Sequence, residues 1–544
     1  MDGLNTTNAA MPSGTLFSRE RTVARPGFNR WMVPPAALAI HLCIGMAYGF
    51  SVFWIPLTRA LGITTPVACP PNETGILQML VTTTCDWRVG DVTVIYTLFF
   101  IFLGSSAALF GGWLERAGPR KAGVVSALCW CGGLVISATG VYLHQLWMLW
   151  LGSGVIGGIG LGLGYISPVS TLIKWFPDRR GMATGMAIMG FGGGALIGAP
   201  LADKLMNYFR GTESVGVWQC FLALAGIYAV FMLAGAFGYR VPPANWVPEG
   251  WASTGAAGRL VTDRNVHLKD AHKTPQFWLI WTVLCLNVSA GIGVIGLASP
   301  MLQEIFGGRL IGEPSIGFGA LSSEQRQSVA TIAAGFVGLL SLFNIAGRFF
   351  WASFSDRIGR KLTYATFFAL GIALYALAPW AAHGGSIGLF VIMMCVILSM
   401  YGGGFATVPA YLADMFGTAY VGAIHGRLLT AWSTAGIIGP MLISWVRDKQ
   451  VAAGVPGPLV YDRTLYMLAG LLAVGAIANL LVRPVASHWF MPMQQQTVSQ
   501  TRASSSGIGR GGFTPLALLA WACVGLPLAW GVFFTLTKAL VLFR

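Results

Sequence analysis

Thirteen apolar stretches, each close to the length that crosses a lipid bilayer, dominate this chain of 544 residues. A transmembrane helix needs about 20 mainly apolar residues, and a helix satisfies its backbone hydrogen bonds within one segment. Only 10% of the residues are charged and the mean hydropathy is +0.67, which excludes a water-soluble fold of this size. The spans fall at about 31–58, 91–113, 122–142, 147–173, 181–203, 218–239, 275–303, 328–354, 362–380, 386–413, 421–445, 464–482 and from 513 onward. The sequence therefore predicts an all-α membrane protein.

The spans are grouped as six, a polar linker, six more and one extra helix. The apolar run after the polar first 30 residues is too long for a signal peptide, so we expect it to be retained as the first transmembrane helix. The expected parts are an N-terminal segment (1–30), a six-helix bundle (31–239), a linker (240–274), a second six-helix bundle (275–485), another linker (486–512) and an extra C-terminal transmembrane helix (513–544).

The Lys and Arg residues are distributed unequally between the two sides of this topology. Segments on the side of the N-terminus hold 22 of them and segments on the other side hold 9. Because cytoplasmic loops carry the surplus of positive charge, we expect the N-terminus and the linker 240–274 in the cytoplasm. The same rule accounts for the net charge of +15 without nucleic acid as a partner.

The two groups of six spans repeat one another. "GGWLERAGPRK" follows the second span and "WASFSDRIGRK" follows the eighth, with Glu115 and Asp356 at equivalent places. The segments 176–200 and 416–440 both run from Phe to Pro, at nearly the same offset along the chain. Duplicated six-helix bundles are typical of the major facilitator superfamily.

The repeated loops resemble the signature of that superfamily. An acid and several bases in a short turn can hold helix ends together in one conformation and release them in another, whereas the alternative is an ordinary positively charged cytoplasmic loop. The residues that we expect to form such a conformational latch are Gly112, Glu115, Arg116, Gly118, Asp356, Arg357, Gly359 and Arg360.

Glycine-rich runs in the fourth and fifth spans do not indicate a nucleotide site. "GSGVIGGIGLGLGY" contains spacings found in dinucleotide-binding loops, but no strand precedes it and no acid follows at the required distance. Small residues instead let transmembrane helices pack closely. The sequence also lacks a cluster of His, Asp or Cys near the interface that would suit an enzyme. We expect no cofactor, no metal ion and no catalytic residue.

Arg348 is a cation deep in the interior of a predicted span. It precedes Asp356 by eight residues, roughly 12 Å along a helix, and no acid lies at a matching depth. A buried charge of this kind faces a pathway or cavity by default, and a guanidinium suits a carboxylate. The sequence favours an anionic substrate over the alternatives, in which Arg348 binds backbone carbonyls or extends toward Asp356.

Four stretches are similar to the oxalate:formate antiporter family of the major facilitator superfamily, with a relationship also to the monocarboxylate transporters. They are "KWFPDRRGMATG", "KTPQFWLIW", "GRFFWASFSDRIGRK" and "DMFGTAY", within a resemblance that covers roughly residues 30 to 485. The resemblance implies alternating-access transport of small carboxylates across a bacterial inner membrane. It also implies an aromatic-lined central site that contains the substrate-binding residues Arg348, Tyr48, Tyr165, Phe191, Tyr401 and Phe405.

Two positions depart from that pattern. Trp432 occupies the place at which the oxalate transporter has a second cation, so a monoanion such as formate, lactate or pyruvate becomes the expected substrate rather than oxalate. Asn344 replaces the acid that the monocarboxylate transporters place before the arginine and cannot titrate. His41, seven residues before Tyr48, is a candidate for proton coupling, and exchange for a counter-transported anion stays open.

The remaining expectations concern the periphery. Cys69 and Cys85 lie in the long loop after the first span, where an oxidising compartment would allow a disulfide, and we interpret the other seven cysteines as core residues. The thirteenth span resembles a small companion helix fused to the chain, and we expect a monomer surrounded by lipid. Besides a monocarboxylate transporter, the open alternatives are an oxalate/formate exchanger, an exporter of amphipathic compounds and a non-transporting nutrient sensor.

Overall fold

The computed structural model describes residues 15–63, 65–70, 75–243, 246–248, 260–492 and 514–539. In this part of the chain, thirteen helical segments are long and apolar enough to span a membrane. The first six are Arg30–Leu57, α4 (Val89–Ala117), α5 (Pro119–Tyr142), Leu146–Trp175, α8 (Arg180–Phe209) and α9 (Val217–Gly238). The next six are α11 (Pro275–Phe306), α12 (Ser323–Ile358), α13 (Arg360–His383), α14 (Ile387–Phe416), Val421–Ala452 and α17 (Asp462–Leu481), and the thirteenth is α19 (Pro515–Ala539). The prediction of an all-α membrane protein is confirmed.

Three spans are interrupted in ways that hydropathy did not reveal. The first consists of α1 (Val33–Ile44), the 3-10 segment η3 (Gly45–Phe53) and α2 (Trp54–Leu57). The fourth consists of α6 (Leu146–Leu149), the π-helical η5 (Trp150–Ile156) and α7 (Gly157–Trp175). The eleventh is divided into α15 (Val421–Leu428) and α16 (Thr430–Ala452). Departures of this kind from the α-helix often mark functional positions.

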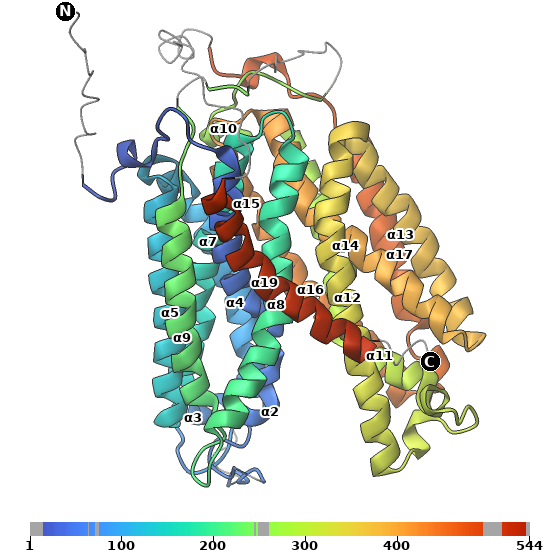
Figure 1. Ribbon diagram of the computed structural model, residues 1–544. Helices are drawn as coiled ribbons and strands as arrows, with labels where there is room; N and C mark the ends of the chain where they lie inside the picture. Colours follow the sequence, from blue (N-terminus) through green and yellow to red (C-terminus); the bar gives the residue numbers. More distant parts are fainter. Residues whose placement is uncertain are drawn as a thin grey trace, which may run out of the picture.

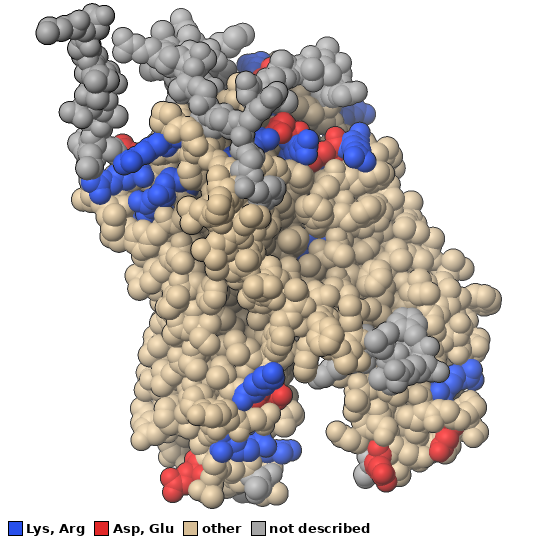
Figure 2. Space-filling view, viewed as in Figure 1, with Lys and Arg blue, Asp and Glu red and all other residues tan. Residues whose placement is uncertain are grey.

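The two groups of six spans lie side by side as an N-half and a C-half (Figure 1). We define the linker end as the end of the bundle at which α10 (Leu268–Ala271) lies, and the opposite end as the one that carries α3 (Ile76–Met79). Near the linker end the halves are in contact, because α15 packs on α4 and α7 and α12 packs on α8. Figure 2 shows the surface notched between the halves at the opposite end. The halves therefore meet near the linker end and part toward the opposite end.

The turns that follow α4 and α12 have the same backbone conformation. Gly118 has φ 86° and ψ 161°, and Gly359 has φ 87° and ψ 152°. A side chain is strained at such positive φ values, so glycine is needed at both places. The sequence repeat thus has a matching repeat in the backbone.

Helix α19 runs diagonally across the molecule and contacts both halves (Figure 1). It packs on α1 and α8 of the N-half and on α12 of the C-half. The Trp521 indole donates to the carbonyl of Trp31 at 3.1 Å, and Lys204 lies 5.2 Å from the centre of the Trp530 ring. Cys523, expected in the core, is exposed on this helix because the helix lies on the outside of the bundle. The seam between α8 and α12 is therefore covered on one side.

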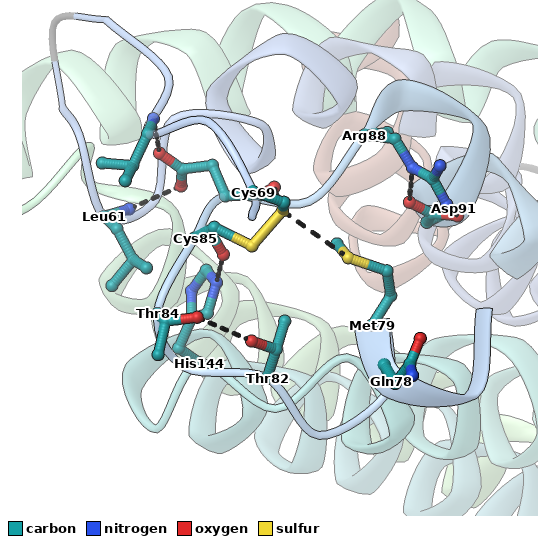
Figure 3. Close-up of a disulfide and its surroundings, with 12 residues drawn as sticks. Leu61, Cys69, Gln78, Met79, Thr82, Thr84, Cys85, Arg88, Asp91 and His144 are labelled. Carbon is teal, nitrogen blue, oxygen red and sulfur yellow. Dashed lines mark hydrogen bonds and ion pairs between the residues drawn. A yellow bond between two sulfur atoms is a disulfide. The ribbon is translucent and has the colours of Figure 1, made fainter. Parts of the chain in front are cut away.

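The loop after the first span is held together by a disulfide between Cys69 and Cys85 (Figure 3). Asp86 accepts hydrogen bonds from three backbone N–H groups of the same loop, at 2.8 to 2.9 Å. His144 donates to the Cys85 carbonyl at 2.8 Å and stacks on Trp87 with ring centres 4.1 Å apart. Burial lowers the pKa of His144 below its ordinary value. The described part of this loop is thus cross-linked at the opposite end.

Candidate functional site

Arg348 lies fully buried on α12, at the interface between the two halves. Its Nε donates to the Asn344 side chain at 2.9 Å, and its Nη1 donates to the Ile188 carbonyl on α8 at 3.0 Å. Its Nη2 has no hydrogen-bond partner among the described residues. No described Asp or Glu forms an ion pair with it, which agrees with the absence of an acid at its depth in the sequence. Two anchors fix the guanidinium plane and leave one edge with an unused donor.

Six aromatic side chains surround this guanidinium. The closest ring centres are those of Phe191 and Phe405, each 5.6 Å from the central guanidinium carbon, with Tyr48 at 6.0 Å. Trp432 connects the group, since its ring centre lies 4.7 Å from Phe405, 5.2 Å from Tyr165 and 5.3 Å from Phe191. The complete set is Tyr48, Tyr165, Phe191, Tyr401, Phe405 and Trp432. The structure thus places every aromatic residue singled out from the sequence in one cluster with Arg348, which we call the arginine site.

The arginine site takes side chains from both halves. Tyr48, on η3 of the N-half, and Tyr401, on α14 of the C-half, are joined by a hydrogen bond between their hydroxyls at 2.9 Å. Tyr48 follows His41 by seven residues, so it lies roughly 10 Å farther toward the opposite end. Of the seven side chains, Tyr48 alone is partly exposed, and the others are buried. The tyrosine pair therefore closes the site on the side that faces the notch.

Two further polar atoms in the site have no hydrogen-bond partner in the described chain. They are the Trp432 indole Nε1 and the Tyr165 hydroxyl. The Tyr48 hydroxyl approaches both Arg348 and Trp432, although neither contact meets the geometry of a good hydrogen bond. Buried donors left without an acceptor are costly, about 1–3 kcal/mol each, so their presence here needs an explanation. The arginine site thus presents unused N–H and O–H groups around one cation.

His41 lies at the edge of the arginine site rather than next to Arg348. Its Nδ1 contacts the Ala187 carbonyl, its Nε2 contacts the Tyr165 carbonyl at 3.2 Å, and its ring stacks on Tyr165. Both nitrogens are therefore engaged with backbone acceptors, of which a neutral imidazole can satisfy one as a donor. This arrangement suits a structural role for His41 as well as a proton site.

At the linker end, Glu115 connects α4 of the N-half to the C-half. Its carboxylate pairs with Lys174 at 2.7 Å, accepts from Ser170 at 3.0 Å and accepts from the backbone N–H of Gly422 at 3.1 Å. Gly422 lies in the first turn of α15, where a helix attracts negative charge. Gly112 packs against Leu268, and Arg116 is exposed and forms no ion pair with a described residue.

The equivalent contact in the other direction is made by Asp356. Its carboxylate accepts from the backbone N–H groups of Gly181 and Met182, in the first turn of α8, at 2.8 and 2.9 Å. Arg360 pairs with Asp356 at 2.6 Å and with Asp414 at 3.0 Å. Each half therefore caps a helix of the other half with an acid from its repeated loop.

The sequence did not identify two members of this second contact. Arg180 on α8 pairs with Asp414 on α14 at 2.9 Å, which adds an ion pair between the halves. Both residues lie in stretches that carried the family resemblance, "KWFPDRRGMATG" and "DMFGTAY", so a signal was present. Arg357, by contrast, is exposed and forms no ion pair in the described part of the chain. A cavity of about 1290 Å³ opens beside these contacts at the linker end, lined by Glu115 among others.

No group of three or more His, Cys, Asp or Glu within the described ranges is placed to hold a metal ion. The arginine site and the contacts at the linker end thus consist of one buried cation, aromatic rings and ion pairs between two halves. Such an arrangement can bind an anion and change the contacts between the halves.

Comparisons with known proteins agree with this architecture. The oxalate:formate antiporter of Oxalobacter formigenes is 26% identical over 413 residues, which cover 76% of this chain and 83% of that protein. Apicoplast pyruvate carrier 1 of Toxoplasma gondii is 25% identical over 482 residues, covering 76% and 84%. The solved structure of the proton:xylose symporter XylE is 14% identical, with a TM-score of 0.59 over 83% of this chain and 95% of that one, and shows the fold alone.

The profile of the Major Facilitator Superfamily matches residues 37–440, which is more than half of the chain. Family and fold together point to a multi-pass membrane transporter and not to an enzyme. The chain belongs to the Major Facilitator Superfamily.

Proposed function

We propose that the protein is a secondary transporter of small monocarboxylates, of the formate, lactate or pyruvate type, and that Arg348 binds the carboxylate. The observation that carries this proposal is the buried guanidinium whose Nη2 has no partner and which no described acid neutralises. A charge of this kind within a membrane needs a counterion, and a carboxylate substrate supplies one. The relatives named for oxalate, formate and pyruvate support the same class of cargo.

The surroundings of Arg348 favour one negative charge over two. Two charge-assisted hydrogen bonds from one edge of a guanidinium suit one carboxylate. Trp432 occupies the far side of the site, where its ring contacts Phe405 and Tyr165 and adds apolar area and a single N–H. A second carboxylate there would lose its hydration without gaining a cation, which costs several kcal/mol. A short apolar tail on a monoanion fits this environment.

We propose a cycle of alternating access, in which a bundle formed by residues 31–239 moves relative to a bundle formed by residues 275–485. The linker end is taken to face the cytoplasm of a bacterial inner membrane, because of the surplus of Lys and Arg on that side. The contacts of Glu115 and Asp356 hold the linker end closed, so this structure represents a state turned toward the opposite, periplasmic side. Opening the linker end breaks both contacts, and the site then faces the cytoplasm.

Transport into proteoliposomes tests the proposal. Labelled formate, lactate, pyruvate and oxalate are each offered with and without an internal anion, and with and without a pH gradient. We expect uptake of at least one monocarboxylate that unlabelled monocarboxylates inhibit more strongly than oxalate does. Dependence on the internal anion would indicate exchange, whereas dependence on the pH gradient would indicate proton symport.

Two results would contradict the proposal. Transport of oxalate alone would refute the argument from Trp432, since a dianion would then bind without the expected second cation. Binding of monocarboxylates in detergent without any flux in liposomes would identify a sensor rather than a transporter.

A further inference from the structure

A second buried histidine, His425, lies beside the arginine site without any hydrogen bond. It is 1% exposed on α15, and neither of its ring nitrogens has a partner among the described residues. A neutral imidazole carries one donor and one acceptor, so burying both unpaired is unfavourable by about 1–3 kcal/mol per group. An ionisable side chain in such a place within a membrane is a candidate for moving a proton.

The position of His425 connects it to the arginine site. Its ring centre lies 5.9 Å from that of Tyr165, and His41 stacks on Tyr165 at 5.3 Å. His425 belongs to the C-half, whereas Tyr165 and His41 belong to the N-half. These three rings therefore form a row that crosses the interface between the halves, which changes during transport. Tyr165 also contacts Trp432, which belongs to the arginine site.

The charged groups around α15 are engaged elsewhere. Arg427, on α15 itself, donates to the Leu268 carbonyl at 2.6 Å and contacts His272. On α4, Glu115 pairs with Lys174 of α7 and caps Gly422, one turn nearer the linker end.

The other elements around α15 follow the same pattern. On α14, Asp414 pairs with Arg180 and Arg360. The titratable rings of the N-half nearest to His425 are Tyr165 on α7, which it contacts, and His41 on α1, which stacks on Tyr165. No described carboxylate stabilises an imidazolium at His425, so this closed arrangement favours the neutral ring.

The access of His425 to water depends on the state of the linker end. In this structure α15 packs tightly on α4, since a Cβ on Gly426 would collide with the backbone of Ala107. His425 follows Gly422 by three residues, so it lies roughly 5 Å beneath the contact between Gly422 and Glu115. Separation of the halves at the linker end would remove the α4 and α7 surfaces that cover the ring.

From these observations we propose that His425 binds the proton that accompanies the monocarboxylate, and that it exchanges this proton with water at the linker end when that end is open and, through the arginine site, with water on the opposite side when the linker end is closed. This inference rests on the proposed function and identifies the proton as the ion whose movement is coupled to that of the monocarboxylate. A lone pair of one ring nitrogen accepts a proton from water when the linker end is open, which gives an imidazolium. The negative charge of the monocarboxylate at Arg348 offsets part of the cost of burying this imidazolium. Return of the proton to water on the other side of the membrane restores the neutral ring, so one proton and one monoanion cross together with no net charge.

The test uses the full-length protein in proteoliposomes and the variant His425→Asn, which stays polar but cannot titrate in this range. Formate, lactate and pyruvate are assayed separately, with a pH-sensitive dye inside the vesicles. A gradient of one pH unit supports about tenfold accumulation at one proton per monoanion. We expect His425→Asn to lose this accumulation and the dye signal, and to keep counterflow between equal anion concentrations. His383→Asn, which alters a histidine paired with Asp462 near the opposite end, should behave as the wild type.

Each other outcome overturns the inference. If His425→Asn still accumulates the anion with its proton, another group carries the proton. If counterflow fails in both His425→Asn and His425→Gln although both variants elute as folded protein, His425 belongs to anion binding or to packing. If the wild type moves monocarboxylate without protons, the inference fails and the proposed function stands. If the wild type moves no monocarboxylate, the proposed function fails as well.

Discussion

Replacement of Arg348 by lysine separates the charge of this residue from its geometry. Lysine keeps one positive charge but loses the Nε bond to Asn344 and the Nη1 bond to the Ile188 carbonyl, both of which orient the guanidinium. It also presents a compact ammonium in place of the planar guanidinium, whose Nη2 is the donor without a partner. The loss of one charge-assisted hydrogen bond, about 1.5–3 kcal/mol, predicts a Kd for the monocarboxylate that rises about 10- to 150-fold.

Replacement of Arg348 by alanine should have a larger effect. The bound carboxylate would then lie among aromatic rings without any cation, and leaving one partner of a buried pair alone costs about 3–5 kcal/mol. This corresponds to a Kd that rises about 150- to 5000-fold, so transport should fall below detection. Removal of the buried cation does not threaten insertion, since charged residues are the costly ones in a membrane helix.

The assay combines two measurements on the same preparations. Isothermal titration or ligand-induced thermal stabilisation in detergent gives the affinity for the monocarboxylate, and counterflow in proteoliposomes gives transport. Arg326→Lys is the matched control, because Arg326 lies on the same helix, α12, near the opposite end, where it donates to the Gly319 carbonyl and lies over the Phe318 ring, far from the arginine site. If Arg348→Lys and Arg348→Ala bind and transport as the control does, the anion does not bind at Arg348 and the reasoning is wrong.

Further predictions test the specificity, the linker-end contacts and the disulfide loop. Trp432→Lys should improve the affinity for oxalate relative to lactate by about 2 kcal/mol or roughly 30-fold, as one new charge-assisted hydrogen bond would, and unchanged competition between the two anions would refute this. Glu115→Gln should weaken the capping of α15 by about 1–2 kcal/mol and so reduce the population with a closed linker end about 5- to 30-fold. The distance between spin labels on the two halves measures this population. Arg116→Gln, at an exposed residue, should leave that distance unchanged. Cys69→Ser should destabilise the loop by about 3 kcal/mol in a thermal unfolding assay without reductant, since the disulfide spans 16 residues, and an unchanged transition would contradict the role of the bond. The stability of the same loop should decrease as the pH falls below about 6.5, because burial holds the pKa of His144 below its ordinary value and the unfolded loop therefore takes up the proton first. Hydrogen exchange of the loop across this pH range measures the decrease. The variant His144→Asn should show no such pH dependence.

The arrangement of the spans followed from hydropathy, whereas their interruptions did not. Length and apolar composition identify a span because lipid leaves the backbone little choice but to form a helix. The break at Leu429 and the 3-10 segment η3 depend on how neighbouring helices pack, for example on the contact of Gly45 with the backbone of Phe191. Such contacts join residues far apart in the chain, and the local pattern carries no record of them.

The candidate site was predictable to a different degree at each residue. Arg348 stands out in any hydropathy reading, since one cation interrupts a long apolar run. The aromatic residues came from the family resemblance, because a Phe or Tyr in an apolar helix has no distinctive pattern of its own. His425 was missed for the same reason: its lack of partners becomes visible only when the surrounding helices are in place.

The position of α19 makes the lateral environment of this transporter unequal on its two sides. One seam between the halves, between α8 and α12, lies under a helix of the chain itself, while no described helix lies over the seam formed by α4 with α15 and α16. Rocking of the halves would change the area that each seam presents to the bilayer. On the covered side, the change in seam area is met by side chains of α19. On the other side, it is met by lipid tails. Bilayer thickness and lateral pressure should therefore act on the cycle mainly through the α4 side.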